Sequence, residues 1–174
     1  MRTTTAPEGT TQVHSDESWF NDLFARHSAD LYRYFARRAP SDDVDDLTAD
    51  VFATAWRRRE DVPAEAELPW LYRTAGFVLA NHRRKGRPTP VAELPEQIDP
   101  ADSAYAAIES EEIRRVLDVL SPRDRQVLLL AAWEGLKGAE LAEVLGLSRA
   151  AADAALYRAR THLTRAWEDR PTSG

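Results

Sequence analysis

The sequence contains no cysteine and only seven glycines among its 174 residues. Without cysteine the chain can form no disulfide, bind no metal through thiolates and use no cysteine nucleophile. Neither a glycine-rich phosphate loop nor a dinucleotide fingerprint occurs. No apolar run approaches the roughly 18 to 20 residues of a membrane span, and the N-terminus lacks the apolar core of a signal peptide. We therefore expect a cytoplasmic protein that is not inserted in a membrane and that holds neither cofactor nor metal.

Lysine is almost absent as well, because 21 of the 23 basic residues are arginine. This bias is expected of a GC-rich genome, and arginine also suits contacts with phosphate. The formal net charge of −6 would disfavour binding to nucleic acid if it were spread evenly. Residues 89–110 instead hold five acidic and no basic side chains, whereas the parts before and after them are close to neutral. Both flanking parts can therefore present local basic faces.

Proline is concentrated in the same acidic stretch. Four prolines lie between residues 88 and 100, directly after Gly86, so a helix cannot persist there. Elsewhere apolar residues recur at helical spacing, and no strand alternation is evident. The sequence thus predicts an all-α protein of two small helical domains joined by an acidic, proline-rich linker. We place the disordered tail, first domain, linker and second domain at residues 1–15, 16–87, 88–103 and 104–170.

The expected helices have recognisable start and stop signals. Ser41, Ser121 and Ser148 are expected N-terminal caps, because a serine side chain accepts a hydrogen bond from the first turn. Pro69 and Pro122 suit a first helical turn, where no backbone N–H is needed. The expected helices cover residues 17–39, 41–59, 70–84, 104–120, 122–134, 139–145 and 149–167.

The last two of these helices form a helix-turn-helix pattern. Gly146 can adopt the left-handed conformation that ends a helix, and Ser148 can cap the next one. Ala142, four residues before Gly146, places a small side chain where the two helices approach each other. In such a motif the second helix enters the DNA major groove. The basic residues Arg158 and Arg160 in that helix favour DNA binding over an ordinary helical hairpin.

Four motifs follow one another between about residues 19 and 168. They are LYRYFARR (31–38), DDVDDLTADVFATAW (42–56), LPWLYRTAGFVLANHRRKGR (68–87) and VLDVLSPRDRQVLLLAAWEGL (116–136), the last followed by the helix-turn-helix. In this order, with an acidic linker after the third, they resemble an extracytoplasmic-function (group 4) sigma factor of bacterial RNA polymerase, of the actinobacterial type. The resemblance implies a transcription initiation factor without catalytic residues, which directs core RNA polymerase to the −10 and −35 elements of promoter DNA. An anti-sigma factor is a usual partner in this family.

The resemblance also implies which residues make the contacts. The second motif corresponds to the segment that docks on polymerase, where an acidic and apolar face suits a basic partner. Its candidate residues are Asp46, Leu47, Asp50, Val51 and Phe52. An alternative is that the three apolar residues of this set belong to the domain core.

The third motif corresponds to the segment that melts and reads the −10 element. An unstacked strand needs aromatic or pocket surfaces for its bases and a cationic track for its phosphates. The loop at about residues 61–68 is expected to help hold a flipped-out base. The candidate −10 contacts are Trp70, Arg73, Phe77, Asn81, Arg83, Arg84, Lys85 and Arg87.

The candidate −35 contacts, on the helix-turn-helix, are Ser148, Arg149, Asp153, Tyr157, Arg158 and Arg160.

Two places depart from the family pattern. Gly76-Phe77 stand where family members often carry Arg-Asn, so Phe77 either packs inward or offers a stacking face. Asp153 and Ala155 stand where a lysine or arginine is frequent. Asp153 would repel phosphate, although an acid can also accept a hydrogen bond from cytosine.

Other functions remain open from the sequence. A degenerate sigma-like adapter would bind polymerase without reading promoters, as Asp153 and Ala155 suggest. A stand-alone helix-turn-helix regulator would have no use for residues 42–56. The run DDVDD (42–46) also matches the DDxxD pattern with which all-α isoprenoid synthases hold magnesium and diphosphate. This enzyme is the remote alternative, because no second metal motif occurs on another predicted helix.

Overall fold

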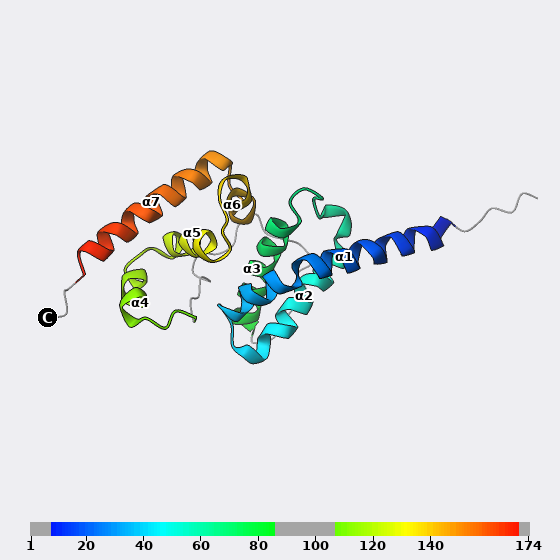
Figure 1. Ribbon diagram of the computed structural model, residues 1–174, viewed down its shortest axis with the longest axis horizontal. Coiled ribbons are helices and arrows are strands. Elements are labelled where there is room, and N and C mark those ends of the chain that lie inside the picture. The colour runs from blue at the N-terminus through cyan, green and yellow to red at the C-terminus, as the bar shows by residue number, and fades with distance from the viewer. Residues whose placement is uncertain (1–7, 86–106, 171–174) are drawn as a thin grey trace, which may run out of the picture.

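The computed structural model describes residues 8–85 and 107–170. These ranges contain helices and no strand, as predicted for an all-α chain. Figure 1 shows an N-terminal part and a C-terminal part that meet near the centre of the molecule. The N-terminal part consists of α1 (Glu8–Ala36), α2 (Val44–Arg57) and α3 (Glu67–Lys85). The C-terminal part consists of α4 (Glu111–Asp118), α5 (Pro122–Trp133), α6 (Gly138–Leu145) and α7 (Arg149–Glu168). The linker predicted at 88–103 lies outside the described residues.

The N-terminal part is a three-helix arrangement in which each helix contacts the other two. Its apolar stripes face inward, and Leu31, Leu47 and Leu71 are fully buried, one from each helix. Phe20 on α1 meets the ring of Phe52 on α2 edge to face, with centroids 6.1 Å apart. Burial of these side chains fixes α2 and α3 against α1.

Several helix boundaries differ from those expected, and α3, for example, begins at Glu67 rather than at Trp70. Helix α1 begins at Glu8 rather than near Glu17, because Pro7 is the last proline before Pro40 and nothing after it interrupts the helix. Ser41 does not cap α2, since Ser41–Asp43 form a separate 3-10 turn and α2 starts at Val44 without a side-chain cap. Helix α4 starts at Glu111, because the Ser110 side chain accepts from the N–H of Ile113 and caps it there.

The boundaries of α5, α6 and α7 follow the predicted signals. Ser121 caps α5 by accepting from the N–H of Asp124, and Pro122 occupies the first turn. Gly146 ends α6 with φ of 65°. The N–H of the next residue, Leu147, bonds to the carbonyl of Ala142 at 2.9 Å, which closes the turn. Ser148 caps α7 by accepting from the N–H of Ala151. The predicted helix-turn-helix is therefore present.

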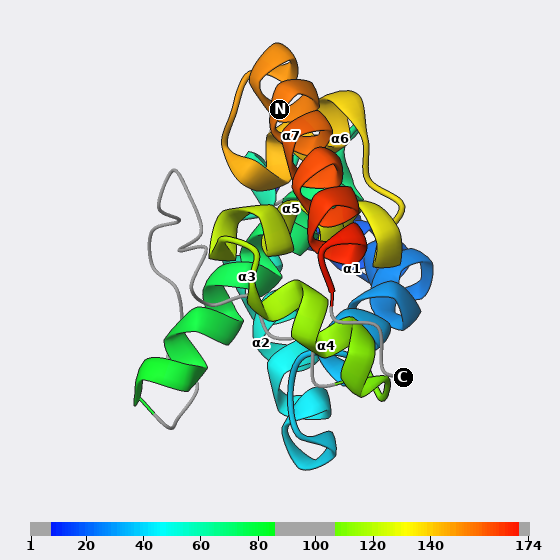
Figure 2. The same cartoon turned by 90° about the vertical axis from the view of Figure 1, so that its left-hand side faces the viewer.

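Helix α7 packs on α5 and α6 along much of its length, which is visible from the side of α4 and α7 in Figure 2. Helix α6 also packs on α3 of the N-terminal part. The buried side chains of both parts form one contiguous apolar cluster, with Leu79 of α3 and Leu145 of α6 among its members. The two parts thus share a packed interface.

Candidate functional site

The structure divides the five residues predicted to contact polymerase on α2. Leu47 and Val51 are fully buried and Phe52 is 3% exposed, so they form the core of the N-terminal part. Asp46 is exposed and Asp50 is partly exposed. The outward face of α2 also includes three residues that the sequence analysis did not single out, Asp45, Ala49 and Ala53. Their exposure at helical spacing opposite the apolar stripe is the signal that could have found them.

Asp50 is in an unfavourable position for a charged group. Burial raises the pKa of its carboxyl, and the nearby Asp46 raises the pKa further, whereas Arg57 and His82 act in the opposite direction. Within the described part of the chain, its Oδ2 atom is buried without a hydrogen-bond partner. The acidic end of α2 is held to α3 by a side-chain contact between Asp43 Oδ2 and His82 Nε2 at 3.1 Å. These carboxylates give this side of the N-terminal part an acidic character.

The residues predicted to contact the −10 element are spread over three environments on α3. Trp70 and Phe77 lie in the core, with Phe77 only 5% exposed, so in this structure Phe77 packs inward. Arg73 is partly exposed, and its guanidinium Nη1 lies 3.6 Å from Glu143 Oε1 on α6. The guanidinium carbon also lies 5.9 Å from the centre of the Phe77 ring. Arg73 is therefore held at the junction between the two parts.

The remaining −10 candidates lie toward the C-terminal end of α3. Asn81 is partly exposed, and Arg83 and Arg84 are exposed. Arg83 Nη2 donates to the backbone oxygen of Arg38 at 2.8 Å. Lys85 ends the helix, and its side chain and Arg87 lie outside what the structure describes.

The loop before α3 is fixed at its end by charged contacts. Glu67, in the first turn of α3, accepts hydrogen bonds from Arg26 and binds His27 Nε2 at 3.0 Å. These contacts hold the start of α3 against α1. Nearer the start of the loop, Asp61 is paired with Arg58 at 2.9 Å and remains exposed. The loop thus places an acid, rather than a cation, on its surface.

The residues predicted to contact the −35 element are gathered on α7. Arg149, Asp153 and Tyr157 recur every four residues and are all exposed, so they share one face of the helix. Arg158 and Arg160 are also exposed, and Ser148 is engaged in the cap. This face contains the cationic, hydroxyl and aromatic groups that read base edges and bind phosphate.

Ala155 and Asp153, the two residues of α7 that depart from the family pattern, lie in different environments. Ala155 is buried beneath the helix together with Ala152 and Ala159, so a cation is not missing from the DNA-facing side at that position. Asp153 does lie on the exposed side, and its Oδ2 is 3.9 Å from Arg149 Nε. Arg149 also extends over Gly138, where an added Cβ would lie 3.6 Å from Nε. Arg149 thus lies beside both Asp153 and Gly138 while its side chain remains exposed.

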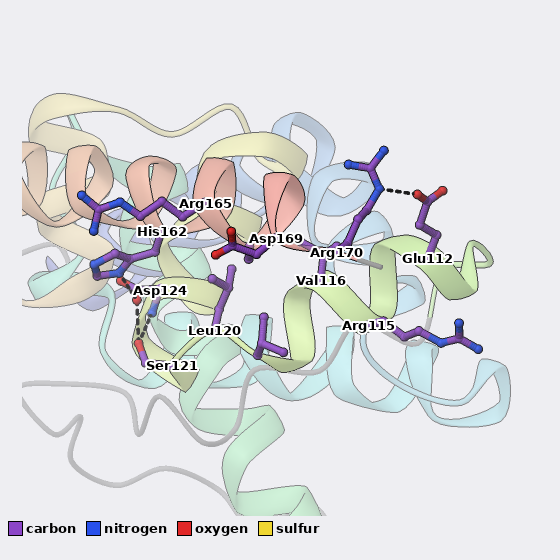
Figure 3. A pocket seen from close by; sticks show the side chains of 12 residues that line it. Glu112, Arg115, Val116, Leu120, Ser121, Asp124, His162, Arg165, Asp169 and Arg170 are labelled. Carbon is purple, nitrogen blue, oxygen red and sulfur yellow. Dashed lines mark hydrogen bonds and ion pairs between the residues drawn. The ribbon is translucent and has the colours of Figure 1, made fainter. Parts of the chain in front are cut away.

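An open groove of about 1100 Å³ lies between α4 and the C-terminal end of α7, as Figure 3 shows. Val116 and Leu120 line it together with Ala166 of α7. A polar contact borders each end of the groove. Arg170 forms an ion pair with Glu112 at 2.7 Å, and His162 Nδ1 lies 2.8 Å from Asp124 Oδ2. The sequence analysis missed this surface, because its walls come from helices that are distant in the chain.

The aspartates of the DDVDD run form no metal site. Asp42, Asp45 and Asp46 are exposed, and Asp43 is paired with His82. Within residues 8–85 and 107–170, no group of three or more His, Asp or Glu side chains is arranged to hold a metal ion. None of the helices in these ranges is long and apolar enough to cross a membrane.

Comparison with known proteins matches a separate family to each of the two parts of the chain. Residues 23–89 match the family Sigma-70 region 2, and residues 110–163 match Sigma-70, region 4. The chain is 29% identical over 166 residues to the RNA polymerase sigma factor NccH of Alcaligenes xylosoxydans xylosoxydans, covering 87% of this chain and 88% of NccH. It is 30% identical over 149 residues to the RNA polymerase sigma-E factor of Streptomyces coelicolor, covering 80% and 81% of the two chains.

A solved structure is similar as well. CnrH in complex with the cytosolic domain of CnrY superposes with a TM-score of 0.54 at 25% identity, covering 89% of this chain and 91% of CnrH. A CnrH sequence from Cupriavidus metallidurans is 29% identical to this chain over 163 residues. The similarity therefore extends through both parts of the chain, in sequence and in fold.

Proposed function

Since the chain belongs to the extracytoplasmic-function group of the sigma-70 family, and is an RNA polymerase sigma factor rather than an enzyme, we propose that it uses separate surfaces on α2, α3 and α7 to direct core polymerase to promoters. The observation that supports this most directly is the helix-turn-helix of α6 and α7. It ends on a helix face that exposes Arg149, Tyr157, Arg158 and Arg160. This arrangement places base-reading and phosphate-binding groups on the helix that such motifs insert in the major groove.

On α7 the position of each residue along the helix indicates whether it contacts base edges or phosphates. Arg149 and Asp153 lie in the first turns after the cap, where recognition helices contact base edges. Arg158 and Arg160 lie further along, where guanidinium groups reach the phosphate backbone. We assign −35 readout to the first pair, together with Tyr157, and backbone binding to the second pair.

On α3 the exposed cations Arg83 and Arg84 form the start of a track for the phosphates of the −10 strand. Base contacts require Arg73 and Asn81, which lie about two and four turns into the helix and are partly exposed. Phe77 and Trp70 support these side chains from the core, because both rings are buried. Their role is to fix the position of α3.

On α2 the surface offered to polymerase consists of the acidic side chains Asp45, Asp46 and Asp50 rather than the buried Leu47, Val51 and Phe52. A cluster of carboxylates steers association with a basic partner. The apolar residues act indirectly, since their burial in the core determines which face of α2 points outward.

The partners follow from the same assignment. Core RNA polymerase and promoter DNA are the principal ones, and a protein that binds as the cytosolic domain of CnrY binds CnrH would act as an anti-sigma factor. Initiation by this factor takes place in the cytoplasm, where the polymerase is. The relatives come from several bacterial groups, and the excess of arginine, 21 residues against 2 lysines, is expected of any GC-rich genome. The narrower assignment to the actinobacterial type therefore stays a proposal.

Transcription in vitro with purified core polymerase and a fragmented genomic library tests the proposal. We expect initiation at a small set of sites that share −10 and −35 elements. Arg158→Ala with Arg160→Ala should abolish this initiation, whereas Arg115→Ala, an exposed arginine on α4, should leave it intact. A chain that co-purifies with polymerase but initiates at no shared element would instead be a sigma-like adapter.

A further inference from the structure

The last turn of α3 is bonded to two other segments of the N-terminal part. His82 Nε2 lies 3.1 Å from Oδ2 of Asp43, which belongs to the 3-10 turn before α2. Because a carboxylate only accepts, Nε2 carries the hydrogen of this bond. The next residue, Arg83, donates through Nη2 to the carbonyl of Arg38 after α1, at 2.8 Å. Two adjacent residues of α3 thus bind the start of α2 and the end of α1.

Arg38 is a firmly held acceptor for the second of these bonds. Its side chain donates to Glu134 at the end of α5 through both terminal nitrogens, at 2.9 and 2.8 Å. Only 5% of the Arg38 side chain and 1% of the Glu134 side chain are exposed. The guanidinium also stacks on Tyr34 at 3.9 Å. A buried, bidentate pair of this kind fixes Arg38, and with it the carbonyl that Arg83 binds.

His82 lies on the inward face of α3. It follows Val78 and Leu79 by four and three residues, and both of these are 2% exposed, so the three side chains share one face. The His82 side chain is 17% exposed. Its Nδ1 atom is buried and has no hydrogen-bond partner in the described part of the chain. A buried polar atom without a partner lowers stability, and an apolar side chain at this place would avoid that loss. Core stability alone therefore does not account for a histidine here.

The position of Arg84 depends on these bonds. Arg84 is exposed, and its guanidinium forms no hydrogen bond or ion pair with residues 8–85 or 107–170. The backbone of the last turn of α3 therefore determines where this cation lies. Figure 2 shows that this end of α3 is at the margin of the molecule. Helix ends at such places fray unless contacts with other segments hold them.

We propose that His82 is a positioning residue for the −10 strand, which holds the last turn of α3 on Asp43 so that Arg83 and Arg84 meet the phosphates. This inference rests on the proposed role of α3 in binding that strand. His82 contacts no DNA, because its ring faces α2. It fixes the end of α3 relative to the helix that is offered to polymerase, so the cations keep one position in the polymerase complex.

The test uses open complexes that core polymerase and the full chain form on a promoter fragment recovered from the genomic library. His82→Leu removes the bond to Asp43 and keeps an apolar side chain on the inward face. His82→Gln keeps an N–H donor for Asp43 and is the conservative variant. Asp43→Ala removes the acceptor. Asp42→Ala is the matched control, since Asp42 is an exposed acid in the same 3-10 turn.

We expect His82→Leu and Asp43→Ala to weaken open complexes and to flatten their salt dependence, by about 0.7 for each single-strand phosphate that is no longer bound. The double variant should be no weaker than either single one, because all three lack the same bond. His82→Gln and Asp42→Ala should behave as the native chain does. The melting temperature of the free chain should not fall in His82→Leu, because the unpaired Nδ1 is removed as well.

Two results would overturn the positioning role. The first is a native salt dependence in His82→Leu under conditions in which Arg84→Ala flattens it. The second is an equal loss of melting temperature and of open complexes in both His82→Leu and His82→Gln, which would show that the ring only supports the fold. If Arg84→Ala leaves the salt dependence unchanged, α3 carries no phosphate track, and the proposed function of α3 fails together with this inference.

Discussion

Arg149 and Asp153 lie one turn apart on the exposed face of α7, with the guanidinium Nε 3.9 Å from the carboxylate Oδ2. The two side chains are 75% and 54% exposed, so the pair is screened by water and contributes little to stability. In the proposed −35 readout, each group would reduce the charge that the other presents to the duplex. Asp153 would then repel phosphate and weaken the attraction of Arg149 for DNA.

Asp153→Asn should therefore tighten non-specific binding to duplex DNA, and Asp153→Lys should tighten it further. Each additional phosphate that is bound steepens the salt dependence of log K by about 0.9, so Asp153→Lys should raise the slope by about one such step. Titrations on cognate and scrambled −35 duplexes at two salt concentrations measure both effects. Glu168→Gln, exposed near the end of the same helix, is the control. If both Asp153 variants instead lose about 1–3 kcal/mol on the cognate duplex alone, Asp153 reads a cytosine.

Arg84 and Arg83 should behave differently although they are adjacent. Arg84→Ala should weaken open complexes on all cognate promoters alike and flatten the salt dependence, by about 0.7 for each single-strand phosphate that is no longer neutralised. Arg83→Ala also removes the bond to the carbonyl of Arg38, so it should lower the melting temperature as well. Salt titrations of open-complex formation and thermal unfolding separate the two variants. A change in promoter preference with an unchanged salt slope would show that Arg84 reads bases.

Asp46→Arg should abolish co-purification with core polymerase while the chain remains folded, because Asp46 is exposed on α2. Asp22→Arg, an exposed acid on α1, is the matched charge reversal and should leave binding intact. Phe52→Ala should act through stability instead, at about 3–5 kcal/mol, since Phe52 is 3% exposed and packs on Phe20 and Phe24. Retained polymerase binding by Asp46→Arg would contradict the assignment of the α2 surface.

Asp50→Asn should raise the free energy of unfolding at neutral pH. The pKa of Asp50 is raised in the folded chain, first by burial and then by Asp46, so its ionisation removes stability as pH rises through the folded pKa. An uncharged Asn avoids this loss. Relief of the repulsion by Asp46, one turn away, contributes about 0.2–0.5 kcal/mol.

The gain from Asp50→Asn should shrink as pH falls toward 3.8, the ordinary value for an aspartate. Urea unfolding at several pH values measures it, with Asp45→Asn as the control for loss of an exposed charge on α2. The same Asp50→Asn variant should bind polymerase more weakly, so the charge is retained at the expense of stability. A gain that persists unchanged at low pH would exclude ionisation of Asp50 as its origin.

The local signals of the sequence predicted the C-terminal part well. Ser121, Ser148 and Gly146 act within one or two turns of themselves, so their roles can be deduced from neighbouring residues alone. Ser41 fails as a cap although two acids follow it, because the chain first makes a 3-10 turn there. The all-α class and the two-part division also follow from apolar periodicity and from the position of the prolines.

The candidate site was less predictable, because burial depends on contacts between distant segments. Phe77 lies on α3, which packs against α1, α2 and α6, and nothing near it in sequence indicates that all of its sides are covered. The apolar stripe of α2 left open whether Phe52 contacts polymerase or lies in the domain core, and the structure places it in the core. Arg38 and Glu134 are 96 residues apart, so no periodicity relates them.

The Arg38–Glu134 pair has a consequence for exchanging halves between proteins of this kind. A chimera that keeps residues 8–85 and takes its second half from a chain without an acid at the position of Glu134 would enclose a guanidinium with no counter-ion. Such a graft is less stable by about 3–5 kcal/mol, unless Arg38 is replaced at the same time. Exchange of the second half between such chains should therefore require a glutamate that is buried between the two parts.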